Sequence, residues 1–464
     1  MLDFIINILA TPAICVGLLA MVGLILQGKP VEEVVKGTIK TIVGFLVVSA
    51  GASYIQTGSL LAFGDLFNYA FNMQGVVPNN EAVVSLALTK FGADSAYIMV
   101  AGMILNIVLA RFSNLKYIFL TGHHTLYMAC MLAVILSLCG LSSWMLWIAG
   151  GCLLAFICAF SPWYCAPTME KIVETDELGF GHFGGLGYWL SAQCGKLFKG
   201  KVNESTEDLN FPQRLTFLRD TTVSIGITMV IFFIVVTGVA VAKGLLDVAG
   251  DYPTLSALVS GDTKTHWLVW AITRGLDFSG AVYVILSGVR LIVSELVPAF
   301  KGIAEKLVPG AVPAIDCPVV FPYAPNAVLI GFLVSFVGGV VGLLVLALVN
   351  RAFPVAMILP GVVPHFFCGA TAGVFGNAEG GWRGCLLGSF VHGLLITFLP
   401  AAVMPVFTNL GFTSATFSDA DFSWMALVFG NLSLNVGATV MFVVSVVVFL
   451  APIVLSLVTK KKSA

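Results

Sequence analysis

Residues 307–325 read LVPGAVPAIDCPVVFPYAP, and this stretch decides how the chain folds. Its five prolines remove backbone donors and prevent a regular helix, although apolar runs long enough to cross a membrane lie on both sides. Irregular backbone at membrane depth survives only where protein or a water-filled cavity satisfies its polar groups. The stretch therefore indicates a broken hairpin that enters the membrane without crossing it, and such hairpins point to a transport site.

Composition places the whole chain in a membrane. Of 464 residues, 58% are hydrophobic and only 10% are charged, and the mean hydropathy is +1.00. A soluble domain carries roughly 25% charged residues. The sequence therefore predicts an all-α integral membrane protein.

Charge and cysteine content exclude several other classes. With 23 Lys and Arg against 24 Asp and Glu, the chain has no basic field for a nucleic acid. Its ten cysteines show neither a Cys-x-x-Cys pair nor a metal-ligand spacing, so we expect no disulfide scaffold, metal site or cofactor. Walker and HExxH motifs are also missing, so transport energy must come from an ion gradient or from another protein.

Hydropathy and charge together predict eleven membrane spans. Ten runs of about 20 apolar residues are clear, near 8–27, 38–57, 95–112, 118–140, 143–162, 220–243, 267–297, 326–349, 384–407 and 433–457. Cytoplasmic ends collect Lys and Arg, and this rule makes the proline-interrupted stretch 352–376 an eleventh span. It also places the N-terminus outside and the C-terminus in the cytoplasm.

Two connections look like further parts of the transport machinery. Residues 58–94 contain Asn79-Asn80-Glu81 and then an apolar run too short to cross, so we expect a second re-entrant segment there. Residues 163–219 read as a cytoplasmic segment. No internal repeat is visible at the level of residues, although inverted repeats are often invisible there.

His123 and Tyr127 share one face of a predicted helix, because they are four residues apart. Histidines at membrane depth are costly unless a cavity or a partner satisfies them. This face could offer hydrogen bonds to a polyhydroxylated ligand, or it could make a polar contact between helices.

Asp316, flanked by prolines, is the strongest single candidate for a functional residue. Apolar surroundings disfavour the charged form of a carboxylate, which suits a group that accepts a proton from a substrate hydroxyl. The alternative is a cap on a helix start, and both roles could hold. By contrast, the pairs Arg274 with Asp277 and Arg290 with Glu295 are close enough along one helix to neutralise each other.

Several strings resemble, in order, the ascorbate-type enzyme IIC of the bacterial phosphoenolpyruvate-dependent phosphotransferase system. They lie at 36–45, 121–123, 181–182, 307–311, 314–317, 324–328, 373–375 and 380–383. The resemblance implies an inverted-repeat core beside a dimerisation or scaffold domain, an elevator-like motion, a homodimer, and a place in the bacterial inner membrane. It also implies one membrane-embedded domain over 1–464, without a fused IIA or IIB domain.

The resemblance further implies that the chain is the membrane subunit of a sugar phosphotransferase. A separate IIB subunit would phosphorylate the bound sugar, with phosphate supplied through IIA, HPr and enzyme I. The pocket then falls on His123, His182, Asp316, Asn80 and Glu81, with Asp316 as the catalytic candidate. L-ascorbate is the leading substrate, with another sugar or sugar acid close behind.

Two positions depart from the ascorbate pattern of that family. Tyr127 stands where the typical carrier has a glutamine, and Phe183-Gly184 follow the second pocket histidine where glutamines are typical.

A different class of function also remains open, namely a transporter driven by an ion gradient that releases its substrate unmodified.

Overall fold

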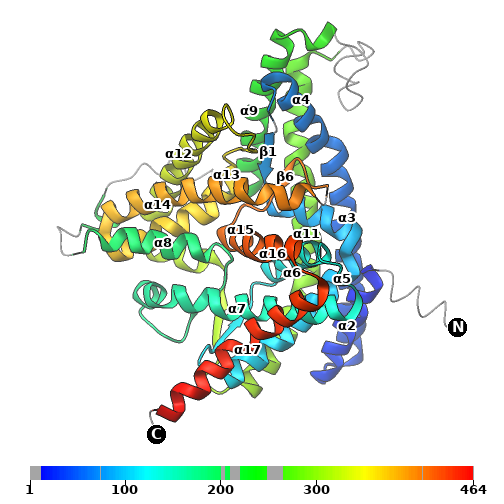
Figure 1. Ribbon diagram of the computed structural model, residues 1–464, viewed down its shortest axis with the longest axis vertical. Coiled ribbons are helices and arrows are strands. Elements are labelled where there is room, and N and C mark those ends of the chain that lie inside the picture. The colour runs from blue at the N-terminus through cyan, green and yellow to red at the C-terminus, as the bar shows by residue number, and fades with distance from the viewer. Residues whose placement is uncertain are drawn as a thin grey trace, which may run out of the picture.

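The computed structural model describes residues 12–73, 75–199, 204–209, 220–247, 265–409 and 411–462. Helices make up most of it (Figure 1). Among the described residues, eight helical stretches are long and apolar enough to cross a membrane. The chain is therefore a multi-pass helical membrane protein, as its composition predicts.

One group of helices packs around α11. Its members are α2 (Pro12–Leu26), α3 (Val31–Ile55), α4 (Leu61–Phe71), α9 (Thr221–Ala242) and α11 (Trp267–Leu307). A π-helical turn, Gln56–Leu60, joins α3 to α4. Asp220 starts α9 by accepting a hydrogen bond from the Val223 amide at 3.0 Å. We call this set the α11 group.

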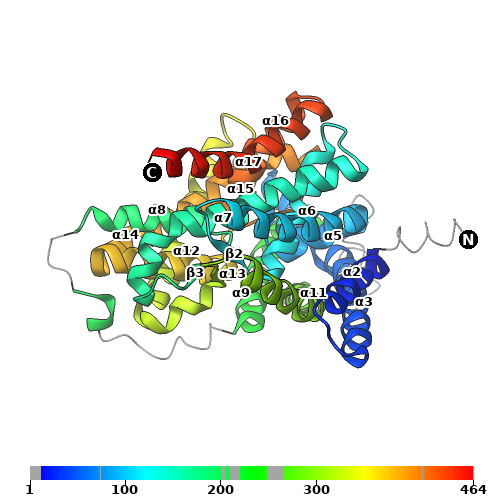
Figure 2. The ribbon, with the colours of Figure 1, turned by 90° about the horizontal axis from the view of Figure 1, so that it is seen from below.

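The second group lies beside the first in both ribbon views (Figures 1 and 2). Its members are α5 (Asn80–Phe112), α6 (Gly122–Ser137), α7 (Ser143–Val173), α8 (Gly185–Lys196), α12 (Pro325–Val349), α13 (Val362–Pro364), α14 (Ala370–Thr408), α15 (Ala420–Met425), α16 (Asn431–Asn435) and α17 (Ala438–Lys462). α14 packs against α8 and α12, and α7 packs against α5 and α17. We call this set the core group.

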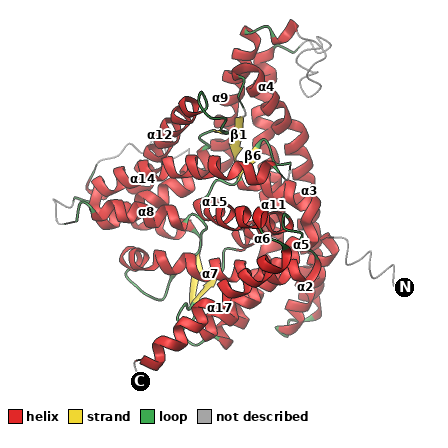
Figure 3. Cartoon of the chain, in the orientation of Figure 1, coloured by secondary structure: helices red, strands yellow, loops and turns green. Residues whose placement is uncertain are grey.

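Six short strands form two parallel sheets, which Figure 3 shows in yellow. The first sheet has the order β5-β1-β6, from Met357–Ile358, Gly75–Pro78 and Ala415–Thr416. The second has the order β2-β4-β3, from Tyr117–Phe119, Val312–Ile315 and Gly179–Phe180. Each central strand comes from one half of the chain, and both of its neighbours come from the other half.

These strands satisfy backbone that the prolines leave irregular. In the second sheet, Tyr117 is in register with Val312, Phe119 with Ala314, and Phe180 with Ile315. The proline-rich stretch is thus hydrogen-bonded as a central strand before it becomes a 3-10 helix, Cys317–Tyr323. Sequence reasoning did not foresee the strands, because two to four residues are too few to show an alternating pattern.

Other predicted boundaries also differ from the structure. The run 118–140 contains a helix of only 16 residues, Gly122–Ser137. The short apolar run that follows Glu81 is not separate, because α5 extends from Asn80 through a kink at Phe91 to Phe112. Part of the first predicted span, 8–27, lies outside the described residues.

The predicted span 352–376 is broken, as its prolines indicate. It holds β5, α13 and a π-helical turn, His365–Gly369, before α14 begins. α14 itself reverses at Gly380 and Gly381, where the backbone leaves the helical region and Gly381 takes a φ of +60°. With eight candidate helices among the described residues, the count of eleven spans stays a prediction.

Close helix packing in the core group depends on glycine. A methyl group added at Gly331 on α12 would lie 2.6 Å from the Gly369 carbonyl oxygen and 2.8 Å from the Gly373 Cα. Both contacts are with backbone, which has little room to give way. Gly331→Ala should therefore lower the free energy of unfolding by about 1–3 kcal/mol.

The measurement is thermal unfolding of the purified protein in detergent. Gly280→Ala on α11 is the matched control, because nothing outside the neighbouring backbone of its own helix lies within 4 Å of the added methyl group there. Equal melting temperatures for the two variants would show that the α12–α14 contact tolerates added volume.

Candidate functional site

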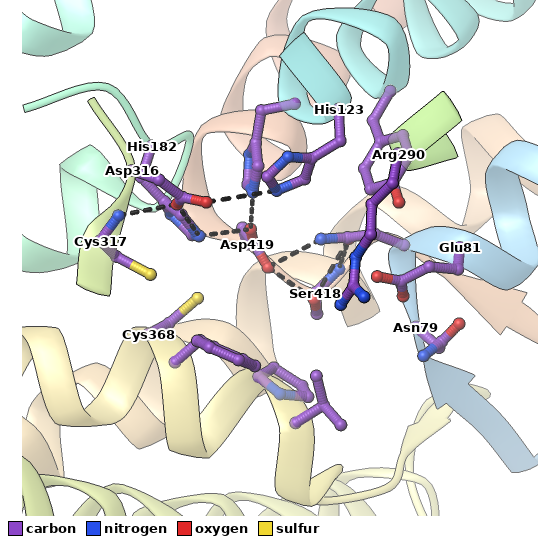
Figure 4. Close-up of a pocket in the computed structure, with 16 residues that line it drawn as sticks. Asn79, Glu81, His123, His182, Arg290, Asp316, Cys317, Cys368, Ser418 and Asp419 are labelled. Atoms are coloured by element: carbon purple, nitrogen blue, oxygen red, sulfur yellow. Dashed lines mark hydrogen bonds and ion pairs between the residues drawn. The ribbon is translucent and has the colours of Figure 1, made fainter. Parts of the chain in front are cut away.

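A polar cavity of about 290 Å³ lies where the two sheets meet the helix starts. Each strand is followed within a few residues by a helical segment, and residues after all six strands contribute to the cavity wall. The wall consists of Asn79, Asn80, Glu81, His123, His124, Tyr127, His182, Arg290, Asp316, Cys317, Val363, Pro364, Phe367, Cys368, Ser418 and Asp419. Figure 4 shows these side chains converging.

Three histidines and two aspartates alternate along the cavity. Asp316 Oδ2 lies 3.5 Å from His123 Nε2, and Asp316 Oδ1 lies 4.0 Å from His182 Nε2. Asp419 Oδ2 lies 3.9 Å from both His182 Nε2 and His124 Nε2. These separations exceed an ordinary hydrogen bond, so the donors and acceptors face each other across gaps.

Neighbouring groups fix the tautomers of two of these histidines. The Phe183 amide donates to His124 Nδ1 at 3.3 Å, and the Gly184 amide donates to His182 Nδ1 at 3.1 Å. The Tyr188 hydroxyl lies 2.8 Å from the same His182 nitrogen. A neutral imidazole whose Nδ1 accepts hydrogen bonds carries its proton on Nε2. Both rings therefore present N–H donors to the cavity.

This arrangement does not suit a metal ion. The described residues contain three groups of possible ligands, and each group includes His124 or His182. To bind a metal through Nε2, either ring would need its proton on Nδ1, where a backbone amide already donates. The cluster is built to form hydrogen bonds instead.

Asp316 takes the capping role that the sequence left open, and its role as a proton acceptor stays a prediction. It is the N-cap of the 3-10 helix, and its Oδ1 accepts from the Cys317 amide at 2.7 Å. Its side chain is 37% exposed in the cavity, so it is less surrounded by apolar groups than the sequence suggests. One carboxylate oxygen thus has a structural partner, and the other faces His123.

Asp419 is a site residue that sequence reasoning missed. Its Oδ1 accepts from Asn80 Nδ2 at 3.0 Å and from the Ser418 hydroxyl at 2.6 Å, and the residue is only 3% exposed. Asn80 Oδ1 in turn accepts from the Ser418 amide at 2.9 Å. This network links the start of α5 to the segment before α15. In the sequence, Ser418-Asp419 resembles an ordinary helix start, so nothing there marked it.

Tyr127 and Glu81 form a second polar corner of the cavity. The Tyr127 side chain is 1% exposed, and its hydroxyl has no partner of hydrogen-bond geometry. The Glu81 carboxylate interacts with this hydroxyl without reaching that geometry. Phe183, the other departure from the ascorbate pattern, is fully buried against Phe119 and does not line the cavity.

A buried carboxylate holds the His182 segment in place. Asp421 accepts from the Ser161 hydroxyl at 2.6 Å, the Tyr164 hydroxyl at 2.7 Å and the Leu186 amide at 2.9 Å. Its own amide donates to the Phe183 carbonyl at 2.8 Å. These bonds tie α7, α8 and α15 together directly beside His182.

The structure brings the six predicted site residues to one cavity: Asn80, Glu81, His123, Tyr127, His182 and Asp316. Their contact with a ligand stays a prediction. The predicted ion pair of Arg274 and Asp277 is present at 2.8 Å. Arg290 lines the cavity instead of serving only as a partner for Glu295, whose side chain lies outside the described part.

His365 and His392 lie outside this cavity. Both ring Nδ1 atoms contact the Ser335 hydroxyl, at 2.8 and 3.1 Å, in the packing between α12 and α14. Their positions indicate a structural role for this pair.

A helical membrane protein with a central polar cavity at broken segments belongs to the class of membrane transporters. Within that class, the chain belongs to the EIIC-GAT family, described as the PTS system sugar-specific permease component, which it matches over residues 7–421. It is also 26% identical, over 472 aligned positions, to the ascorbate-specific PTS system EIIC component of Mycoplasma pneumoniae (strain ATCC 29342 / M129 / Subtype 1). That alignment covers 93% of this chain and 71% of the relative.

Replacing His123 or His182 by alanine should weaken ligand binding by about 1–3 kcal/mol, because each change leaves a polar group of the ligand unpaired. L-ascorbate, which the Mycoplasma relative's name specifies, is the probe for calorimetry on the purified chain. His266→Ala is the control, since His266 is exposed and lies outside the cavity. Unchanged affinity in both cavity variants would assign these histidines a structural role.

Proposed function

We propose that this sugar permease takes up L-ascorbate or a related sugar or sugar acid and holds it while phospho-IIB phosphorylates it. One observation carries the proposal, namely the gaps of 3.5 to 4.0 Å between histidine Nε2 atoms and carboxylate oxygens. A hydroxyl group both donates and accepts, so it fits between such pairs. A polyhydroxylated ligand would fill several gaps together.

The reaction needs little chemistry from the permease itself. The phosphoryl group would leave a phosphocysteine of IIB, so that an S–P bond breaks and an O–P bond forms at the sugar hydroxyl. The proton of that hydroxyl would pass to Asp316, whose Oδ2 faces the cavity. Positioning and charge placement would supply most of the catalysis. IIB and IIA, and indirectly HPr and enzyme I, are therefore the proposed partners.

An inverted-repeat core belongs to the same proposal, and the strands support it. β1, β2 and β3 begin at Gly75, Tyr117 and Gly179, with spacings of 42 and 62 residues. β4, β5 and β6 begin at Val312, Met357 and Ala415, with spacings of 45 and 58 residues. The first strand of each set pairs with the last two strands of the other.

The remaining parts of the proposal rest on family resemblance and on charge placement. They are eleven spans with the N-terminus outside and the C-terminus in the cytoplasm, location in the bacterial inner membrane, a homodimer, and elevator-like movement of the core group against the α11 group.

Uptake by the purified chain in lipid vesicles tests the proposal. We expect accumulation of labelled sugar only when phospho-IIB is present inside, and the accumulated product should be phosphorylated. Unphosphorylated IIB is the control. Accumulation of unmodified sugar driven by a proton or sodium gradient alone would replace the proposal with a secondary transporter.

Asp316→Asn should separate proton acceptance from capping. Asparagine caps a helix start nearly as well as aspartate, but it lacks the charge and the basicity. If the carboxylate accepts the hydroxyl proton, the variant should still bind L-ascorbate while phosphorylation falls by about 10²–10⁴-fold. The assay uses saturating phospho-IIB, and Asp316→Ala serves as the variant that loses both roles. Near-normal phosphorylation in Asp316→Asn would leave only binding or capping.

A further inference from the structure

Arg290 differs in origin from the other residues of the cavity. It lies on α11, whereas the other lining residues lie on the core group or on the strand ends that precede its helices. α11 packs mainly against α3 and α9. Two residues before Arg290, a methyl group added at Gly288 would lie 2.5 Å from the Gly44 carbonyl oxygen on α3, so the two backbones are in close contact. The α11 group therefore positions Arg290.

Arg290 lines the cavity together with the carboxylates Glu81, Asp316 and Asp419. In the view of Figure 4 its guanidinium is drawn near the labelled Ser418 and Glu81. Among the described residues, the ion pairs closer than 4.0 Å do not include Arg290. Arg274 on the same helix is different, because it pairs with Asp277 at 2.8 Å and donates to the Gly58 carbonyl at 3.0 Å. An arginine is always charged, and Arg290 is an exposed residue of the cavity wall.

Among the described residues that line the cavity, Arg290 alone has a permanent positive charge. The neutral histidines offer N–H donors, and Glu81, Asp316 and Asp419 are acceptors that suit hydroxyl groups. None of these supplies a fixed positive charge for an anion. A guanidinium, in contrast, binds carboxylate, enolate or phosphate oxygens through paired N–H groups.

We propose that Arg290 binds an anionic group of the ligand, so that the α11 group and the core group share the binding site. This inference rests on the proposed function for the nature of the ligand. The anion is either the sugar's own acidic group or the phosphoryl group that it receives. The contact exists only in an arrangement that holds α11 beside the cavity, so movement between the two groups would change affinity for anions and not for neutral sugars.

The experiment compares wild type, Arg290→Gln and Arg290→Lys by calorimetry with three probes. L-ascorbate represents the acidic sugar, xylitol a neutral polyol, and inorganic phosphate, tested as a competitor of ascorbate, the phosphoryl group. Arg290→Gln should bind ascorbate or phosphate about 10–100-fold more weakly, the range expected for one charged hydrogen-bonding partner. Arg290→Lys should show an intermediate loss, and xylitol binding should change less than about twofold.

The three probes distinguish the anionic groups that Arg290 could bind. Weaker ascorbate binding assigns the arginine to the acidic sugar, and a loss of phosphate competition alone assigns it to the phosphoryl group. Unchanged binding of both anions, or an equal loss for xylitol, would overturn the inference. Arg351→Gln is the control, since Arg351 is exposed after α12 and outside the cavity.

Two further measurements distinguish loss of the Arg290 contact from misfolding and from failure of the proposed function. If Arg290→Gln fails to fold, as judged by its melting temperature, the comparison of Arg290→Lys with wild type at rising ionic strength replaces it, and salt-independent ascorbate binding would contradict the inference. The binding assays contain no IIB. Unchanged anion binding together with intact phospho-IIB-dependent uptake would therefore reject only the role of Arg290.

Discussion

The need to pair backbone polar groups at membrane depth governs this structure. Prolines at 309, 313, 318, 322 and 325 make a continuous helix impossible there, and lipid offers no hydrogen bonds in exchange. The backbone groups of Val312–Ile315 are hydrogen-bonded instead because this strand lies between two other short parallel strands. In the first sheet, Gly75–Pro78 is the central strand in the same way. Each strand leads into a helix start. The strand pairing that forms the backbone hydrogen bonds therefore also brings the polar side chains at these helix starts together.

The cavity is held by buried carboxylates that accept several hydrogen bonds. Asp421 accepts hydrogen bonds from two neighbouring helices, α7 and α8, and Asp419 is fixed through Asn80 and Ser418. Such satisfied networks rigidify their surroundings, whereas an unpaired buried group would destabilise them. Asp419 Oδ2 lies 3.9 Å from two histidine nitrogens, the Tyr127 hydroxyl has no partner at hydrogen-bond geometry, and both residues line the cavity. The site therefore has two parts: hydrogen-bonded residues that hold its shape, and polar atoms that are available to a ligand.

The helices and six of the cavity residues could be predicted from the sequence, whereas the strands, Asp419 and the place of Arg290 in the cavity could not. Long apolar runs and proline clusters are local signals, and they located the helices and the break at Asp316. Strands of two to four residues carry no local signal, and their pairing joins positions up to about 340 residues apart, such as Val77 with Ala415. Asp419 was missed because it resembles a cap. Arg290 was assigned to Glu295 because sequence distance along one helix cannot show that α11 passes beside a cavity built by the core group.

The two departures from the ascorbate pattern have unequal consequences for specificity. Phe183 stacks on Phe119 at a ring distance of 4.4 Å, outside the cavity, so its change from an amide alters packing and not ligand contacts. Tyr127 faces the cavity, and its phenol is one donor and a weaker acceptor, where an amide offers two donors and a carbonyl acceptor. A buried hydroxyl left unpaired costs about 1–3 kcal/mol, so a ligand must place a polar atom beside Tyr127 and Glu81 to bind well. The substitution thus keeps the demand for a polar group at this corner of the cavity and narrows the geometry in which a ligand can meet it.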